Sequence, residues 1–382
     1  MSELGEKRIH DNPPGIKDIA KALGVSIGTV DRALHGRPGI NPMTRAKVLK
    51  MAQTLGYQPN FAARHLKLNR KMRISVHLPS EIASFFDALR DGIEEAARPF
   101  QSNIEVQFHS HARLGEGDTE LFSKALASGS NGIILAPGHP VDLKPWIRKA
   151  ARAHIPVVCV ATDAPGTERL ASISTDAFTS GAVVAEVLQL SAARSGSVLI
   201  VTGDLSTVDH AEKVRGFRTF LEKAGSSLRL GAVLEAHDEA EQAYRLTQEC
   251  LTKHPEIGAV YVSTANSMPV IAALEDAGRL GKIPLITTDL FPALAPLIRD
   301  GKILATVYQR PKAQGRMAFG ALHQFLVQGT CPPLRHRIQP HLVFRSNLDV
   351  FLEMLPTDSE EAAGSQEVPG RVRGKLVQKP SS

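Results

Sequence analysis

Four consecutive segments near the N-terminus decide the fold of this part of the chain: IKDIAKALGVS (16–26), IGTVDRALHGRPG (27–39), NPMTRAKVLKMAQTLG (41–56) and YQPNFAARHLK (57–67). Gly24 permits a tight turn after the first segment, and Ser26 is a favourable N-cap for a helix that continues to Leu34. Asn41 is a second N-cap, and Pro42 suits the first position of the helix that follows it. The segments therefore predict three short helices, the first at residues 16–23, and a fourth segment that starts near a proline.

Apolar residues recur at helical spacing in the three predicted helices and define a small common core. The residues expected in this core are Ile19, Ala20, Leu23, Val30, Ala33, Leu34, Val48, Leu49, Ala52 and Leu55. On the second helix the pattern leaves Ile27, Gly28, Asp31 and Arg32 facing outward. A helix, a tight glycine turn and a second short helix with small and basic outward positions fit a DNA major groove. Gly56 is expected to end the third helix.

The charge of the chain is unevenly distributed. Residues 1–73 carry 14 Lys and Arg against 5 Asp and Glu, whereas the remaining residues carry 31 against 34. A basic head on a nearly neutral body indicates a local polyanionic partner.

The three cysteines are Cys159, Cys250 and Cys331, and they are far apart in the sequence. Their spacing fits neither a metal site nor a disulfide framework, so we expect thiols in a reducing compartment. No apolar N-terminal segment suggests a signal peptide, and no stretch of about 20 apolar residues suggests a membrane span. These features predict a cytoplasmic protein without a membrane partner.

Two fragments look like enzyme motifs but lack the required context. Residues 24–28 match the GxSxG pattern of serine hydrolases, yet that motif follows a strand, whereas here a helix precedes Ser26. Residues 115–117 give only GEG, without the third glycine of a dinucleotide-binding loop. The sequence therefore predicts no enzyme, no cofactor and no metal site, and a Rossmann-type enzyme is the weaker alternative.

From residue 72 onward, short apolar segments alternate with amphipathic ones. The segments expected as buried parallel strands are RISVHLP (73–79), NIEVQFH (103–109), GIILAP (132–137), PVVCVAT (156–162), SVLIVTG (197–203), AVYVS (259–263) and PLITTD (284–289). Helical patterns lie between them. Because the β-α-β-α-β pattern repeats on both sides of residues 162–175, we expect an α/β body of two doubly wound parallel-sheet lobes. Ligands of such sheets bind at the carboxyl ends of the strands.

The N-terminal segments resemble the lactose-repressor (LacI/GalR) family of bacterial transcription regulators. The matching elements are IKDIAKALGVS, TVDRAL, TRAKVL, LGYQPN and the AARHLK hinge. The DNA-binding residues that this resemblance implies are Ser26, Ile27, Gly28, Thr29, Arg32, Asn60, Ala63 and Leu66. Among them, Ser26 and Thr29 hold phosphate-contact positions, and Leu66 holds the position of the hinge leucine that enters the minor groove.

In the recognition helix that the resemblance implies, only a few side chains are chemically able to recognise DNA bases. Arg32 can donate two hydrogen bonds to guanine, and Ile27 can contact a thymine methyl group. Gly28 has no side chain with which to read a base. Asp31 replaces a serine common in the family, and it either reads a cytosine amino group or caps a neighbouring group. A hinge leucine that unstacks a base step would bend the duplex and add a shape-dependent contribution.

The body resembles periplasmic sugar-binding proteins of the ribose-binding type over residues 73–328. The clearest matches are SFFDALRDGI, PVVCVATDAPG, ISTDAFTSGAVVAEVL, VRGF, PLITTDLFPAL and ILATVYQRP. The pocket residues that the resemblance implies are Phe85, Phe86, Thr162, Asp163, Asn266, Asp289 and Gln309. Carboxylates and amides suit vicinal hydroxyls, and aromatic faces cover a sugar ring, so the resemblance implies a sugar or polyol effector. Each residue also has a purely structural alternative, such as a helix cap for Asp289.

Two departures from the family pattern concern the ligand. The family often has Asp-Arg at the end of the fourth strand, where this chain has Ala161, Thr162 and Asp163. The arginine expected before the RGF-like stretch is missing, and we expect His210 as its substitute. Because a forked donor is hard to replace, ribose itself is not the expected ligand. A purine or a phosphorylated metabolite is the alternative effector.

These observations divide the chain into five parts: a flexible arm (1–15), a helix-turn-helix domain (16–58), a hinge helix or linker (59–71), an effector-binding and dimerisation body (72–355) and a disordered tail (356–382). The resemblance implies a homodimer that binds double-stranded operator DNA as a repressor. Lobe closure on the effector would displace the paired hinges and change operator affinity.

Overall fold

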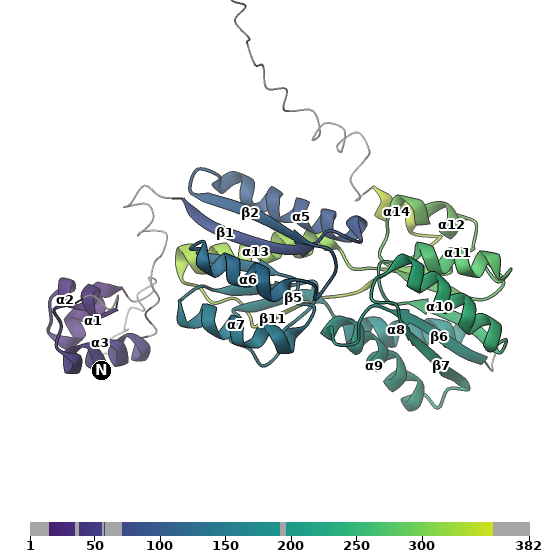
Figure 1. Cartoon of the computed structure of the whole chain (residues 1–382), viewed down its shortest axis with the longest axis horizontal. Helices are drawn as coiled ribbons and strands as arrows, with labels where there is room; N and C mark the ends of the chain where they lie inside the picture. The colour runs from purple at the N-terminus through teal and green to yellow at the C-terminus, as the bar shows by residue number, and fades with distance from the viewer. Residues whose placement is uncertain (1–14, 35–37, 56, 58–70, 192–195, 354–382) are drawn as a thin grey trace, which may run out of the picture.

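The structure is a computed structural model that describes residues 15–34, 38–55, 57, 71–191 and 196–353. Within these ranges the chain forms a small helical head and a two-lobed α/β body (Figure 1). The predicted hinge residues Asn60, Ala63 and Leu66 lie outside the described residues, as do Gly56, residues 1–14 of the predicted arm and the predicted tail.

The head consists of three helices, α1 (Ile16–Leu23), α2 (Ile27–Leu34) and α3 (Pro42–Thr54). Gly24 ends α1 in a left-handed conformation with φ of 64°. The Ser26 hydroxyl accepts a hydrogen bond from the Thr29 N–H at 3.1 Å, which confirms the predicted cap of α2. Asn41 caps α3 by accepting from the Met43 N–H at 2.9 Å. The predicted limits of α1, the predicted start and end of α2 and the predicted start of α3 are therefore confirmed.

The core of the head contains most of the residues expected there. Its fully buried members are Ile19, Ala20, Val30, Ala33, Val48 and Ala52, with Leu23, Leu34 and Leu55 half-buried against them. Leu49 was wrongly expected in this core, because 45% of its surface is exposed. Successive side chains of a helix point about 100° apart. Val48 is buried in the core, and the side chain of Leu49 next to it therefore points toward the exposed side of α3.

Lobe 1 is a six-stranded, fully parallel sheet in the order β11-β5-β4-β3-β1-β2. Its strands are β1 (Met72–Pro79), β2 (Ile104–His111), β3 (Gly132–Leu135), β4 (Val157–Val160), β5 (Ala171–Thr175) and β11 (Arg335–Ile338). Its helical segments are α5 (Ala83–Ala97), η1 (Arg98–Phe100), α6 (Asp118–Ala127), α7 (Pro140–Arg152) and α13 (Pro311–Gln328). Strands β1, β3 and β4 are buried almost throughout, as predicted from their continuous apolar runs.

Lobe 2 is a second six-stranded sheet, in the order β12-β10-β9-β8-β6-β7. Its strands are β6 (Gly196–Thr202), β7 (Leu228–Glu235), β8 (Ile257–Val262), β9 (Leu285–Thr288), β10 (Ala305–Tyr308) and β12 (His341–Phe344). Only β12 runs antiparallel, along β10 at the edge of the sheet. The helical segments are α8 (Ala177–Ser191), α9 (Val208–Lys223), α10 (Ala240–Lys253), α11 (Met268–Asp276), η2 (Pro292–Leu294), α12 (Ala295–Arg299) and α14 (Leu348–Leu352).

The chain crosses between the lobes three times. The first crossing joins β5 to α8, as the repeat on both sides of residues 162–175 predicted. The second joins β10 to α13, and the third joins β11 to β12. Helix α13 and strand β11 thus return to lobe 1, so each lobe is built from two separate parts of the chain.

Each lobe contains one helix pair whose backbones touch at glycines. A Cβ at Gly315 of α13 would lie 2.1 Å from the Leu89 carbonyl oxygen of α5. In lobe 2, a Cβ at Gly181 of α8 would lie 1.8 Å from the Lys213 carbonyl oxygen of α9. Neither position leaves room for any side chain. The contact in lobe 2 fixes the helix that carries Lys213, a residue of the central cavity described below.

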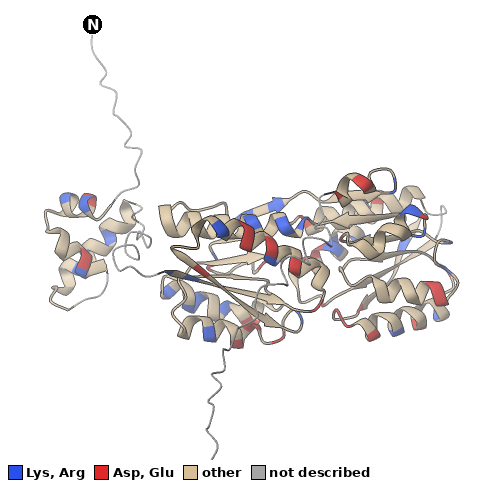
Figure 2. Ribbon diagram, turned by 90° about the horizontal axis from the view of Figure 1, so that it is seen from above, with Lys and Arg blue, Asp and Glu red and all other residues tan. Residues whose placement is uncertain are grey.

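Charged residues of both signs occur on the helices of both lobes (Figure 2). None of the helices within the described ranges is long and apolar enough to cross a membrane.

Candidate functional site

Helix α2 presents a largely exposed outer face. Ser26, Ile27, Gly28 and Arg32 are exposed, and Thr29 is half-buried. The hydroxyls of Ser26 and Thr29 lie 2.8 Å apart, and the Arg32 Nε donates to the Gly28 carbonyl oxygen at 3.1 Å. The face therefore offers hydroxyl groups at the start of a helix, an apolar side chain and one guanidinium, as direct reading of DNA requires.

Asp31 of α2 is close enough to Tyr57 to affect its hydroxyl group. Its side chain is half-buried. Burial raises the pKa of the Tyr57 hydroxyl, and the nearby carboxylate of Asp31 raises it further. The proximity to Tyr57 favours the second role considered for Asp31, a contact with a neighbouring group of the head, over base reading.

A central cavity lies between the lobes at the carboxyl ends of the strands. Six of the eight residues expected in the effector pocket line it: Phe85, Phe86, Thr162, His210, Asp289 and Gln309. The cavity also contains residues that were not expected there, namely Thr207, Asp209, Lys213, Asp238 and Thr264. Parallel strands of both sheets end at this gap, so the fold gathers side chains that are far apart in the sequence.

Backbone strain is concentrated around this cavity. Seven non-glycine residues of the described part of the chain have positive φ, and six of them follow strands that end at the cavity: Ile82, Ala161, His237, Asp238, Asp289 and Arg310, with φ from 49° to 67°. Each such residue costs about 1–3 kcal/mol, and it persists only because the contacts around it hold it in place. This clustering is typical of a binding site whose side chains are positioned in advance.

Lys213 supplies a buried cation in the central cavity. Its side chain is 1% exposed, and its Nζ lies 2.7 Å from Asp209 Oδ2. The same nitrogen donates to the Ser263 carbonyl oxygen and to Gln309 Oε1, each at 3.1 Å. Burial alone would lower the pKa of Lys213, but Asp209 and Asp289 more than offset this effect, so its pKa is raised and the ammonium stays charged.

Asp289 and Gln309 continue the same network. Gln309 donates to Asp289 through its side-chain nitrogen at 2.7 Å and through its backbone N–H at 3.1 Å. Burial raises the pKa of Asp289 to about 6, and the hydrogen bonds from Gln309 limit the rise. Asp209 differs from Asp289, since its Oδ1 is buried without a hydrogen-bond partner among the described residues. That oxygen remains available to a ligand hydroxyl.

Two aromatic rings form the apolar side of the cavity. Phe85 and Phe86 are 6% and 4% exposed, and their rings meet edge to face with centroids 5.0 Å apart. His210 also lines the cavity, but its Nδ1 lies 3.1 Å from the Asp204 carbonyl oxygen. His210 therefore stays a prediction as the substitute for the missing arginine, and Lys213, three residues further along α9, adds a buried cation that was not expected.

The other two expected pocket residues lie outside the central cavity. Asp163 is held by the buried Arg169, whose Nε lies 2.5 Å from Asp163 Oδ1. Asn266 donates to the Asp238 carbonyl oxygen at 3.0 Å and lines a separate cavity with Phe291. The contacts with Arg169 and with the Asp238 carbonyl oxygen determine where these two side chains lie, and the spacing of apolar strands in the sequence does not predict such contacts.

Several contacts hold the lobes close together. Thr207 of lobe 2 donates to the Gly138 carbonyl oxygen of lobe 1 at 3.0 Å, and the Asp209 N–H donates to Thr162 Oγ1 at 3.3 Å. His139 Nε2 lies 3.3 Å from Asp204 Oδ2. The free volume of the central cavity is about 40 Å³. Because ligand pockets usually measure about 300 Å³ or more, a ligand can enter only if the lobes move apart.

Comparison with known proteins agrees with both parts of this structure. The family model of bacterial regulatory proteins, lacI family, matches residues 15–60, and the periplasmic binding protein domain matches residues 74–330. Catabolite control protein A from Priestia megaterium is 27% identical over 265 residues, which are 69% of this chain and 78% of that protein. The HTH-type transcriptional regulator AglR from Rhizobium meliloti is 26% identical over 327 residues, or 84% and 90% of the two chains.

Among solved structures, the body is similar to GanP, a glucose-galactose binding protein from Geobacillus stearothermophilus. The two share 25% identity with a TM-score of 0.68, and the match covers 73% of this chain and 99% of GanP. The expected two-lobed fold is therefore confirmed. Taken together with the helix-turn-helix head, these matches show that the chain is a DNA-binding transcription regulator of the lacI family with a periplasmic-binding-type body.

Proposed function

We propose that this regulator is a cytoplasmic, homodimeric repressor whose operator binding is controlled by a neutral sugar or polyol in the central cavity. The domain division and site residues expected from the sequence are part of this proposal, with Asp209 and Lys213 added to the effector site. The absence of a catalytic role is also part of it.

The observation that carries the proposal is the composition of the central cavity. The aromatic pair Phe85 and Phe86 offers apolar surface for a sugar ring. Across the cavity, Asp209 Oδ1 offers an unpaired acceptor for a ligand hydroxyl, and the contacts of Lys213 with Asp209 and Gln309 hold this carboxylate in place. A buried polar group left unpaired costs about 1–3 kcal/mol, so a ligand with hydroxyls at the right places is strongly preferred over one without them.

The charges of the cavity disfavour a phosphorylated effector. Lys213 is accompanied by three carboxylates, those of Asp209, Asp238 and Asp289. Without a surplus cation, a phosphate dianion would meet net repulsion in a desolvated site. Related binding proteins support a neutral ligand, since a Pseudomonas aeruginosa relative with 23% identity is named D-ribose/D-allose-binding protein.

Lobe movement supports control of the head. A sugar can enter only when contacts such as the one between Thr207 and Gly138 open. The three crossings between the lobes then act as the hinge. In a homodimer, a change of lobe angle would alter the spacing of the two heads, and two half-sites one helical turn apart would sense that spacing.

Thermal unfolding of the full-length protein with a panel of ligands tests the effector class. The panel contains D-ribose, D-allose, D-glucose, D-galactose and ribitol, with glucose 6-phosphate and adenine as the alternatives. A neutral sugar at 100 times its Kd should stabilise the protein by about 2.7 kcal/mol. Stabilisation by adenine or the phosphorylated compound alone would contradict the proposal.

Matched variants show whether the stabilising ligand occupies the central cavity. Asp209→Asn should weaken sugar binding at least about tenfold, because it removes the carboxylate that faces the cavity. Asp300→Asn changes an exposed carboxyl group outside the cavity and should bind as the wild type does. Equal affinities of the two variants would place the ligand elsewhere.

A further inference from the structure

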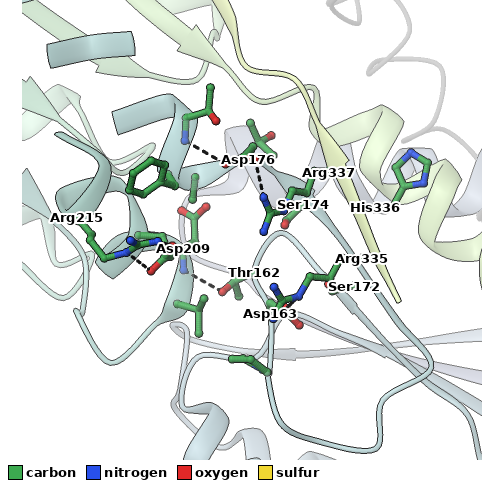
Figure 3. Close-up of a pocket in the computed structure, with 17 residues that line it drawn as sticks. Thr162, Asp163, Ser172, Ser174, Asp176, Asp209, Arg215, Arg335, His336 and Arg337 are labelled. Atoms are coloured by element: carbon green, nitrogen blue, oxygen red, sulfur yellow. Dashed lines mark hydrogen bonds and ion pairs between the residues drawn. The ribbon is translucent and has the colours of Figure 1, made fainter. Parts of the chain in front are cut away.

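A second cavity of about 410 Å³ lies beside the central one, on the side of strand β11. Figure 3 shows its walls, formed by β5 and β11 of lobe 1 and by the first turns of α8 and α9 of lobe 2. The two cavities share Thr162 and Asp209. Because the Asp209 N–H donates to Thr162 Oγ1, this contact separates them. The second cavity is far larger than the central one and needs no lobe movement to hold a small molecule.

Two arginines of β11 point into this cavity from one face of the sheet. Arg335 and Arg337 are two residues apart on a strand, so their side chains project to the same side. The register of the parallel pair places them beside Ser172 and Ser174 of β5, which also line the cavity. Figure 3 shows both guanidinium groups extending from β11 toward the cavity, whereas His336 points away from it. The strand thus presents two forked donors next to two hydroxyl groups.

The guanidinium of Arg335 is not needed to neutralise the carboxylate beside it. Asp163 already receives Arg169 Nε at 2.5 Å and Arg169 Nη2 at 2.8 Å, and this pair is buried. Arg335 reaches the same carboxylate only at 3.5 Å and is 49% exposed. Its donors are therefore available to another anion. Arg337 is similarly accessible, since it contacts Asp176 at 3.1 Å while 58% of its side chain is exposed.

The opposite wall adds a cation from lobe 2. Arg215 pairs with Glu212 on the same helix and lies over the ring of Phe178 at 4.4 Å. Around the whole cavity, counting the buried partners of its carboxylates, the cations are Arg169, Lys213, Arg215, Arg335 and Arg337, and the carboxylates are those of Asp163, Asp176, Asp209 and Glu212. Three arginines and four carboxylates line the cavity itself, and the buried Arg169 and Lys213 pair with two of these carboxylates. Arg335 is therefore the cation left over in this cavity, whereas in the central cavity three carboxylates accompany Lys213.

We propose that the second cavity binds a small organic anion, with a phosphate or carboxylate group held by Arg335 and Arg337. Forked guanidinium groups recognise both kinds of anion through paired hydrogen bonds. The cavity is lined by both lobes, so a bound anion joins β11 to the first turns of α8 and α9. It stabilises the lobes in the arrangement described above and acts as a second signal beside the neutral effector. This inference goes beyond the proposed function and does not require it.

Thermal unfolding of the full-length protein tests the anion site. The probes are inorganic phosphate, glucose 6-phosphate and citrate at equal ionic strength, with sodium chloride as the reference and glucose as the neutral comparison. At ten times its Kd, a bound anion should raise the Tm by about 3 °C. A response to glucose 6-phosphate but not citrate identifies a phosphate ligand, and the reverse identifies a carboxylate.

Variants decide where the anion binds. Arg335→Gln and Arg337→Gln should each reduce the anion-dependent rise of Tm by at least half while leaving the response to neutral sugars unchanged. Arg152→Gln removes an exposed arginine of α7 that does not line the cavity, and it should respond as the wild type does. The proposal is overturned if no anion raises the Tm above the chloride reference, or if the rise persists in both β11 variants. It is also overturned if glucose 6-phosphate acts only as glucose does, with a rise of Tm that both β11 variants retain.

Discussion

Replacing Lys213 with methionine should destabilise the body strongly, because it removes the cation of a buried ion pair. The side chain is 1% exposed, and methionine fills a similar volume without the charge. The change leaves the Asp209 carboxylate, the Ser263 carbonyl oxygen and the Gln309 amide oxygen without their donor. Removing one partner of a buried ion pair typically costs about 3–5 kcal/mol, because the remaining charge is uncompensated. For a domain of this size that loss lowers the Tm by roughly 6–20 °C.

Urea unfolding followed by circular dichroism measures this loss, and a double-mutant cycle assigns its cause. In the double variant Asp209→Leu/Lys213→Met, no isolated carboxylate remains at this position. Its loss of stability should be smaller than the sum of the two single losses by about 1–3 kcal/mol. As a control, Lys253→Met changes a lysine of α10 that is 71% exposed, and it should alter stability by no more than about 0.5 kcal/mol.

Two results would refute the reasoning about Lys213. The first is a Lys213→Met variant within about 1 kcal/mol of the wild type, which would mean that the ammonium is not paired as described. The second is strict additivity of the single losses in the cycle. Additivity would show that Lys213 and Asp209 contribute independently, so that the central cavity contains no coupled charge pair.

Three further predictions concern the head, the helix packing and the sheet of lobe 1. Arg32→Ala should cost about 1–3 kcal/mol of binding to operator DNA and much less on random DNA at fixed salt, and equal losses in fluorescence anisotropy would contradict base reading. Gly315→Ala should destabilise the protein by about 1–3 kcal/mol, whereas Gly320→Ala on the same helix meets nothing within 4 Å and should stabilise it by up to about 1 kcal/mol; similar Tm changes would disprove the close helix contact. Burial, followed by the charges of His109 and His111, lowers the pKa of His77 from 6.5 to about 3, so the unfolded chain binds one more proton between these values. Relative to His77→Leu, the wild type should therefore lose about 1.4 kcal/mol per pH unit as the pH falls below 6.5, and parallel stability curves would disprove it.

The helices of the head were predictable because local chemistry determines them. Ser26 and Asn41 cap helices through their own side chains, and Gly24 adopts the left-handed conformation that few other residues tolerate. The apolar spacing identified most of the core. It failed at Leu49, which lies about 100° around α3 from the buried Val48 and is 45% exposed.

The two lobes were predictable from continuous apolar strands, but their composition from separate parts of the chain was not. Strand β11 has the sequence RHRI, which shows no apolar run, and its first three residues are exposed. It pairs with β5 through backbone hydrogen bonds at the edge of the sheet. Edge pairing depends on the path of the chain after α13, and a local pattern contains no information about that path.

Some residues of the central cavity could be predicted from the sequence, and others could not. Phe85, Asp289 and Gln309 follow strands or begin helices, so their place at the sheet edge follows from the topology. Lys213 lies within α9, four residues after Asp209, where a lysine is usually a solvated partner of its neighbour. Its burial results from the approach of β8 and β10, and only the folded structure reveals it.

The most direct test of the central claim measures operator affinity with and without the neutral sugar that stabilises the protein. Fluorescence anisotropy with a fragment selected from genomic DNA gives the Kd at fixed salt. The account predicts that saturating sugar changes the Kd for the fragment by about 5- to 150-fold in the wild type, and that the sugar concentration needed for this change is raised in Asp209→Asn. An operator Kd that stays constant while the sugar is bound would contradict control of the head by the central cavity.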